Sequence, residues 1–185
     1  MKIAVVVGHQ EKSPGAINKD FGVSEFAFNR ILAHDIELNF AKYNKSDECG
    51  VVYRETTFKE LPDQLNELGM DLIVSLHANA FNGEAFGCEM LYYHKSEKGK
   101  KVAQILQDKL LTLFQSNDRG IKPRTTEDRG GYLLRYTKAP CVICEPFFID
   151  ENEDYRDAQK HFDSGELTKA YCEAINEAVK YLREA

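Results

Sequence analysis

The sequence is poor in positive charge. It has 24 Lys and Arg against 30 Asp and Glu, which gives a formal net charge of −6. The basic residues are dispersed along the chain, so the sequence predicts no basic surface for nucleic acid. The acidic balance also disfavours simple electrostatic attraction to anionic membranes or other anionic polymers. Functions that depend on a broad positive field are therefore disfavoured.

Long apolar runs and paired cysteines are missing as well. The N-terminal apolar run, residues 3–7, is too short for the core of a signal peptide and far too short to span a membrane. We therefore expect a chain synthesised in the cytoplasm without a signal peptide and without membrane insertion. The chain has 5 cysteines, an odd number that in this context favours reduced thiols.

Cys141 and Cys144 form a Cys-x-x-Cys pattern, which raises the alternatives of a zinc site or a redox site. The pair lies in an apolar, strand-like run. Residues three apart on a strand point to opposite faces, so the two sulfurs are not expected to converge. Because no second pair follows at zinc-knuckle spacing, we disfavour both alternatives.

The order of apolar patterns predicts one α/β domain over residues 1–185. No internal repeat, low-complexity segment or linker divides the chain. Strands are predicted at 2–7, 51–54, 72–77, 87–93 and 141–147. Helices are predicted at about 24–43, 58–68, 97–115 and 166–182, and residues 119–131 are predicted to be rich in turns. Strands that alternate with long helices indicate a layered sheet flanked by helices.

Two predicted strands end on histidine. "KIAVVVGH" ends on His9 and "LIVSLH" ends on His77. Functional sites in such sheets gather at strand ends, so the two imidazoles are candidates to share a metal ion. The alternative is that each is an ordinary hydrogen-bonded residue at a strand end. His34, His94 and His161 lie in polar contexts and are predicted to be surface residues.

Glu25 is the candidate for a third metal ligand, since a catalytic zinc normally takes three protein ligands and keeps one position for water. On the first helix it shares a face with Phe28 and Leu32, which should pack inward. A carboxylate on that face is costly unless a cation meets it. The alternative is that Glu25 only stabilises the helix N-terminus by its charge.

Glu145 is a second unusual carboxylate, near the end of the apolar run "APCVICEPFF". It shares strand parity with Cys141 and Ile143. Burial tends to raise the pKa of a carboxyl group, which suits a general base near neutral pH. The alternative is a salt bridge with Arg129 or Arg135. Hydrolysis at a metal site with two His and one Glu needs such a base.

These residues lie in motifs that resemble those of a known family. The stretches "VVGHQEKSPGA", "SEFAFN", "LIVSLHANAFNGEAFGCEMLYY", "DRGIKP" and "GYLLRYTKAPCVICEPFF" are similar, in this order, to segments of the zinc-dependent N-acetylmuramoyl-L-alanine amidases. That family includes bacterial enzymes that remodel the cell wall and phage endolysins. The likeness runs from about residue 3 to about residue 150.

The resemblance implies that His9, Glu25 and His77 bind Zn²⁺ and that Glu145 is catalytic. It implies a single three-layer domain with a mixed sheet of roughly six strands flanked by helices. The implied reaction is hydrolysis of the amide between N-acetylmuramic acid and L-alanine. The implied partner is peptidoglycan, and the implied place of action is the bacterial cell wall.

The chain departs from the family pattern beside the candidate site. Residues 10–12 read Gln-Glu-Lys where the family often has glycines, and Ser13 precedes Pro14 where an acidic residue is common. Pro146 follows Glu145 where a glycine is usual. These changes leave the four candidate residues intact and bear on the shape of the groove and on substrate preference.

Several functions remain as alternatives at this point. The lack of an export signal and of a wall-binding module favours an endolysin-like role in wall lysis over a remodelling amidase of the host. Another zinc amide hydrolase, or a carboxypeptidase, fits the same four residues. A wall-binding or regulatory domain without activity is disfavoured by the intact set.

Overall fold

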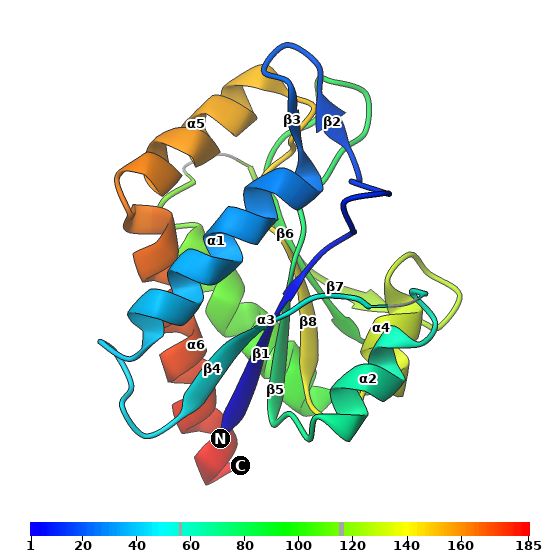
Figure 1. The fold of residues 1–185 in the computed structure, drawn as a ribbon, viewed down its shortest axis with the longest axis vertical. Helices are drawn as coiled ribbons and strands as arrows, with labels where there is room; N and C mark the ends of the chain where they lie inside the picture. Colours follow the sequence, from blue (N-terminus) through cyan, green and yellow to red (C-terminus); the bar gives the residue numbers. More distant parts are fainter. Residues whose placement is uncertain (56, 115–116) are drawn as a thin grey trace.

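A mixed sheet of six strands forms the centre of the computed structural model, which describes residues 1–55, 57–114 and 117–185 (Figure 1). The strand order is β4-β1-β5-β8-β6-β7. β4, β1, β5 and β8 are parallel, whereas β6 pairs antiparallel with β8 and parallel with β7. The predicted mixed sheet is therefore confirmed. The strands are β1 (Lys2–Val7), β4 (Glu48–Val52), β5 (Leu72–Leu76), β6 (Cys88–Tyr93), β7 (Asp118–Arg124) and β8 (Cys141–Glu145).

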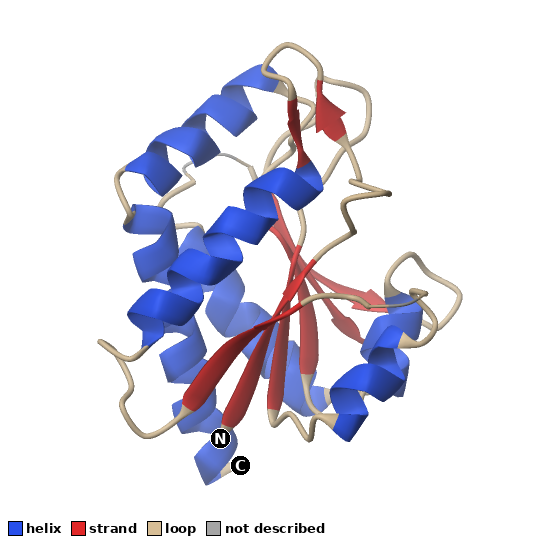
Figure 2. Cartoon of the chain, viewed as in Figure 1, coloured by secondary structure: helices blue, strands red, loops and turns tan. Residues whose placement is uncertain are grey.

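Helices cover both faces of this sheet and complete the three layers (Figure 2). One face packs against α1 (Glu25–Phe40), α3 (Glu97–Leu110), α5 (Asn152–Asp163) and α6 (Glu166–Glu184). The other face packs against α2 (Leu61–Glu67) and α4 (Gly131–Tyr136). A small hairpin of β2 (Ile17–Asn18) and β3 (Val23–Ser24) precedes α1. No helix among the described residues combines the length and the apolar character that a membrane crossing requires.

The core lies on both faces of the sheet, which explains why its central strands are apolar throughout. In β1, Ile3 and Val5 enter the larger cluster beneath α1 and α6, while Ala4 enters the smaller cluster beneath α2 and α4. Cys141 and Cys144 of β8 likewise belong to opposite clusters. The prediction that the two sulfurs do not converge is confirmed.

Two predictions of the secondary structure were wrong, and one helix was missed. The segment predicted to be rich in turns contains β7, an edge strand that is largely half-exposed and includes Pro123. The strand predicted at 51–54 is β4, which begins earlier, at Glu48, and ends at Val52, its last residue paired with β1. α5 was not predicted, since it buries only Asp154, Tyr155 and Ala158.

Smaller differences concern the ends of helices and the outer histidines. α3 ends at Leu110, and its predicted end at Gln115 lies outside the described residues. His34 and His94 are exposed, as predicted. His161 is instead partly buried, and its Nδ1 lies 2.8 Å from a Glu166 carboxylate oxygen.

The two chain termini lie beside each other at the amino end of the sheet (Figure 1). The amino group of Met1 and the guanidinium of Arg183 both contact the Asp47 carboxylate. The carboxyl ends of β1, β5 and β8 lie at the opposite end of these strands.

Leu32 and Leu38 offer a matched test of the core beneath α1, because their side chains are 1% and 74% exposed. Leu32→Ala is expected to lower the free energy of unfolding by about 2–5 kcal/mol, since it leaves a cavity in a packed core. Leu38→Ala on the same helix should change it by no more than about 0.5 kcal/mol. Denaturant unfolding measures both, and equal effects would contradict this packing.

Candidate metal centre

His9 and His77 lie side by side at the carboxyl ends of two adjacent parallel strands. β1 and β5 pair with Val7 opposite Leu76, and the Gly8 N–H donates to the Leu76 carbonyl at 2.9 Å. The chain then leaves both strands with the two imidazoles in edge-to-face contact. Their ring centroids are 5.2 Å apart.

The Glu25 carboxylate lies between these two rings. Ser24 caps α1 through a hydrogen bond from the Ala27 N–H, and this places Glu25 at the first helical position. Its side chain is fully buried. One carboxylate oxygen lies 2.8 Å from His77 Nδ1 and the other lies 3.1 Å from His9 Nε2. The structure thus brings the three predicted ligands together.

The three side chains fit the requirements of a metal site. Each offers one donor atom, and these atoms all lie within 4.8 Å of one another. His9 Nε2 is buried and faces the Glu25 carboxylate at 3.1 Å. Two imidazole nitrogens and one carboxylate oxygen are typical of sites that leave a further coordination position for water. The three residues therefore form a candidate metal centre.

The environment of Glu25 favours its ionised form. Burial raises its pKa, but hydrogen bonds and positive charge from His77 and His9 outweigh burial and hold the pKa well below its usual range. The backbone N–H of Ala78 also donates to the carboxylate at 3.1 Å. A buried carboxylate that stays charged is suited to meet a cation.

The backbone around the site makes room for these side chains. His9 has a φ of 67° and is the one non-glycine residue with positive φ in the part of the chain that the structure describes. A Cβ at Gly8 would lie 2.7 Å from the His77 ring, and one at Gly15 would lie 2.5 Å from a Glu25 oxygen. Such strain and close approach cluster at functional sites.

The loop before α1 is tied to the start of the helix. The N–H groups of Glu25 and Phe26 donate to the carbonyls of Ala16 and Pro14 at 2.9 and 3.0 Å. The Ala16 N–H donates back to the Glu25 carboxylate at 3.3 Å. These bonds hold Gly15 against the site and fix the position of the carboxylate.

Glu145 lies at the end of β8, the neighbour of β5. The His77 N–H donates to the Cys144 carbonyl at 2.9 Å, so Glu145 and His77 are adjacent on neighbouring strands. Both line a pocket of about 180 Å³, together with His9. Burial raises the pKa of Glu145, and the nearby His77 and Arg129 charges oppose this only in part.

The alternative of a salt bridge for Glu145 is not supported by the described residues. No cation lies within ion-pair distance of its carboxylate in residues 1–55, 57–114 and 117–185. Arg135 instead lies over the Tyr93 ring, 5.3 Å from its centroid. The structure places all four candidate residues at one edge of the sheet.

A polar network around Glu89, on the strand next to Glu145, was not predicted. Glu89 of β6 lies opposite Glu145, is buried, and accepts from Arg119 at 2.7 Å and from Asn79 at 3.1 Å. Asn82 accepts from two nearby backbone N–H groups and stabilises its own turn. Of the two asparagines near His77 in the sequence, only Asn79 therefore points to a buried partner beside the site.

Arg54 was also missed by the sequence analysis. It follows β4 and lines the same pocket as Glu145 and His77. A usable pattern existed, because the strand predicted at 51–54 is a third strand that ends on a polar residue. Since parallel strands present their carboxyl ends at one edge, that pattern places Arg54 near His9 and His77.

Comparisons with known proteins agree on one family. A family model described as N-acetylmuramoyl-L-alanine amidase matches residues 3–177. Over 159 residues the chain is 28% identical to the N-acetylmuramoyl-L-alanine amidase LytC of Bacillus subtilis. The aligned region covers 80% of this chain and 29% of LytC. It is 36% identical over 113 residues to an uncharacterized cell wall amidase of Bacillus anthracis, with 57% of this chain and 20% of that protein covered. The chain thus spans less than a third of the length of these two relatives.

Solved structures show the same fold. The catalytic domain of the CD27L endolysin, which targets Clostridia difficile, is 32% identical with a TM-score of 0.78, covering 95% of this chain and 96% of that one. An N-acetylmuramoyl-L-alanine amidase from Clostridium difficile 630 has a TM-score of 0.79 at 20% identity, covering 100% and 97%. The fold of this chain is therefore shared with the solved structures of an amidase and of an endolysin catalytic domain.

Gly15→Ala tests the close approach at the centre, and Gly22→Ala is its matched control. Both glycines have positive φ, so each substitution should cost about 1–2 kcal/mol of stability from backbone strain. Only a Cβ at position 15 meets Glu25 and His9, whereas nothing lies within 4 Å of one at position 22. Gly15→Ala is expected to weaken the binding of a divalent metal ion roughly 10- to 100-fold, and Gly22→Ala should leave it unchanged.

Elemental analysis and competition with a chromogenic chelator measure this difference. Circular dichroism and thermal unfolding confirm that both variants are folded. Equal metal affinity in the two variants would show that the candidate centre does not depend on this clearance.

Proposed function

Because the chain belongs to the N-acetylmuramoyl-L-alanine amidase family, we propose that it is a zinc-dependent enzyme that hydrolyses the amide between N-acetylmuramic acid and L-alanine in peptidoglycan. We propose residues 1–185 as a single catalytic domain. The observation that carries the proposal is the fully buried Glu25 carboxylate between His9 and His77, with Glu145 at the adjacent strand end. This arrangement supports a hydrolytic metal site more directly than a wall-binding surface.

His9, Glu25 and His77 are the residues proposed to hold Zn²⁺. Their donor set matches that of catalytic zinc sites with two His and one Glu. When bound, zinc supplies Lewis-acid polarisation of the scissile carbonyl and lowers the pKa of a coordinated water. The burial of Glu25 and the strained backbone at His9 support a fixed ligand geometry before any ion binds.

Glu145 is proposed as general base and then as general acid. Its carboxylate accepts a proton from the attacking water while the water oxygen bonds to the carbonyl carbon. It then donates that proton to the departing nitrogen as the carbon–nitrogen bond breaks. The products are the muramic-acid carboxyl group and the free amino group of L-alanine. Its buried position and raised pKa support both transfers near neutral pH.

The proposed biological role is endolysin-like lysis of the cell wall. The likeness to the CD27L endolysin catalytic domain over nearly the whole length of both chains supports this role. The likeness to LytC keeps a remodelling amidase as the second candidate. Both roles use the same bond cleavage, so they differ in when and where the enzyme meets peptidoglycan.

Purified peptidoglycan tests the proposed reaction. The enzyme with zinc is expected to release stem peptides with a free L-alanine amino terminus from glycan strands that keep their lactyl carboxyl groups. Mass spectrometry of the soluble products identifies the bond. A zinc chelator should stop the reaction and added zinc should restore it, because the metal supplies the Lewis acid.

Two other outcomes would contradict the proposal. Cleavage within the stem peptide, without new L-alanine amino termini, would identify another zinc amide hydrolase or a carboxypeptidase. Full activity in the chelator would remove zinc from the mechanism. A separate assay with whole cells addresses the biological role. Loss of turbidity when the protein is added to the cells would favour the lytic role over remodelling.

Glu145→Gln tests the proton transfers. The variant should keep its fold and its zinc but lose about 100-fold or more in kcat, the usual size of a general acid–base contribution. In the unsubstituted enzyme, kcat/KM should fall as pH decreases through the raised pKa of Glu145, above its ordinary value of 4.5, because protonation removes the base.

Zinc content and thermal unfolding serve as controls for this variant. Glu145→Gln replaces a carboxylate whose burial is costly at neutral pH with a neutral amide. The variant should therefore gain stability relative to the unsubstituted enzyme at neutral pH. This gain should vanish at pH values below the ordinary carboxyl pKa, where Glu145 is protonated in both the folded and the unfolded state. Near-normal turnover in Glu145→Gln would remove Glu145 from the mechanism.

A further inference from the structure

The pocket beside the candidate metal centre is apolar apart from a few polar groups. Besides His9, His77 and Glu145, two cations line it, Arg54 and Arg129. Its apolar wall is formed by aliphatic side chains from β1, β6, β8 and the two helices on this face. They are Val6, Leu61, Leu91, Leu133 and Ile143.

Arg54 and Arg129 differ from every other arginine of the chain. The others each contact a carboxylate or lie over an aromatic ring. They are Arg30, Arg119, Arg124, Arg135, Arg156 and Arg183. Within the described residues, neither Arg54 nor Arg129 has a carboxylate at ion-pair distance, a side-chain hydrogen bond or a ring contact. Among the described residues, the pocket therefore holds the two guanidinium groups that have neither a carboxylate partner nor a ring contact.

Arg54 has a specific unsatisfied group. Its Nε is buried and has no hydrogen-bond partner among the described residues. A buried donor without a partner costs free energy, and such groups in folded proteins usually await a ligand or water. Burial lowers the pKa of Arg54, but a guanidinium stays charged at neutral pH. Its main chain is fixed, since Gln10 Nε2 donates to the Arg54 carbonyl at 2.9 Å.

The two arginines come from separate segments that meet at the pocket. Arg54 follows β4, which pairs with β1 up to Val6 opposite Val52, so it lies beside the end of β1. Arg129 precedes Gly130, the N-cap of α4. Because the chain as a whole carries a net charge of −6, an anion gains little attraction away from this pocket.

We propose that Arg54 and Arg129 bind a carboxylate on the peptide side of the scissile bond. The enzyme then prefers stem peptides in which the residue after L-alanine carries a free carboxylate over those in which it carries an amide. This inference rests on the proposed function. It deepens that function by naming the chemical form of the substrate.

The chemistry of the substrate places the anion on the peptide side. N-acetylated sugars are uncharged, and the lactyl carboxyl of muramic acid is consumed in the scissile amide. The stem peptide, in contrast, brings carboxylates close to that bond. A guanidinium pairs with a carboxylate through two parallel charge-assisted hydrogen bonds. A carboxamide is uncharged and offers only one acceptor oxygen, and its NH2 group would face a guanidinium N–H, donor against donor. The aliphatic wall of the pocket suits the methyl and methylene groups that accompany such a carboxylate.

Binding of the product peptides tests this inference without relying on turnover. The probes are two dipeptides that begin with L-alanine and differ only in a carboxylate or a carboxamide on the second residue. By calorimetry, the zinc-loaded protein is expected to bind the acid at least about tenfold more tightly, the usual gain from a hydrogen bond to a charged group. Arg54→Gln should bind the two dipeptides about equally.

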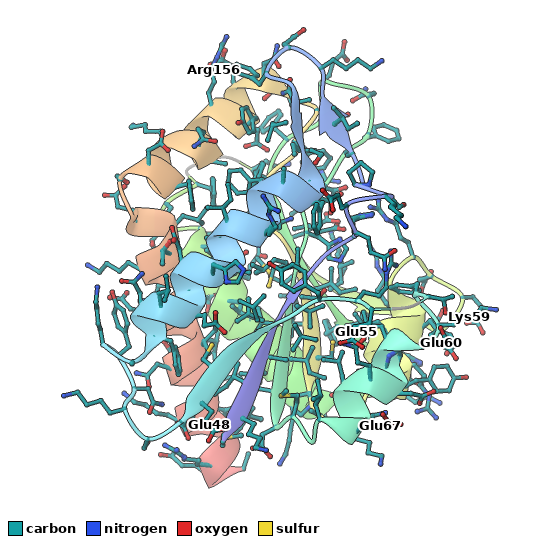
Figure 3. All side chains as sticks on the ribbon, viewed as in Figure 1. Glu48, Glu55, Lys59, Glu60, Glu67 and Arg156 are labelled. Carbon is teal, nitrogen blue, oxygen red and sulfur yellow. The ribbon has the colours of Figure 1, made fainter. Side chains whose placement is uncertain are left out.

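Lys59→Gln is the matched control, since it removes an exposed positive charge near the start of α2 that does not line the pocket (Figure 3). It should keep the full preference for the acid. Arg129→Gln, at an exposed position, is the second variant and should also reduce the preference. Thermal unfolding confirms that each variant is folded.

Equal binding of the two dipeptides by the unsubstituted protein would overturn the inference. Full preference in both arginine variants would overturn it as well. Preference for the acid without cleavage of peptidoglycan would contradict the proposed function and support the arginine assignment. Cleavage of the muramoyl–alanine bond without any preference for the acid would support the proposed function and contradict the arginine assignment.

Discussion

The burial of the Glu25 carboxylate is the interaction on which the rest of the site depends. Taking a carboxylate out of water is costly unless charge and hydrogen bonds replace the lost hydration. Here His9 and His77 approach it from two strand ends, and backbone N–H groups complete its environment. The left-handed backbone at His9 and the absence of a side chain at Gly15 both follow from this arrangement, because either a regular strand end or a Cβ would displace a ligand.

Two buried carboxylates at one edge of the sheet therefore behave in opposite ways. Hydrogen bonds and charge from two imidazoles keep Glu25 ionised, whereas Glu145 lies in a largely apolar pocket that raises its pKa. A metal ligand must stay ionised and so needs a low pKa, whereas a group that takes up and releases a proton needs a pKa nearer neutral pH. The fold supplies both by placing one residue at a helix start between two rings and the other at the end of an apolar strand.

The parts predicted from the sequence are those with strong apolar periodicity. β1, β5 and β8 are buried on both faces, and their ends position His9, His77 and Glu145 as expected. β7 and α5 were missed because an edge strand and a polar helix bury too few side chains to leave a pattern. The end of the strand predicted at 51–54 could have placed Arg54 near the site, but the sequence could not show that its buried Nε lacks a hydrogen-bond partner among the described residues.

The meeting of both termini at Asp47 has a consequence for how this domain is combined with others. The chain enters and leaves at the amino end of β1, while the candidate site lies beyond the carboxyl end of the same strand. A module joined at either terminus therefore departs from the side of the sheet farthest from the site. A module attached at either end therefore starts away from the pocket and does not cover it at the point of attachment.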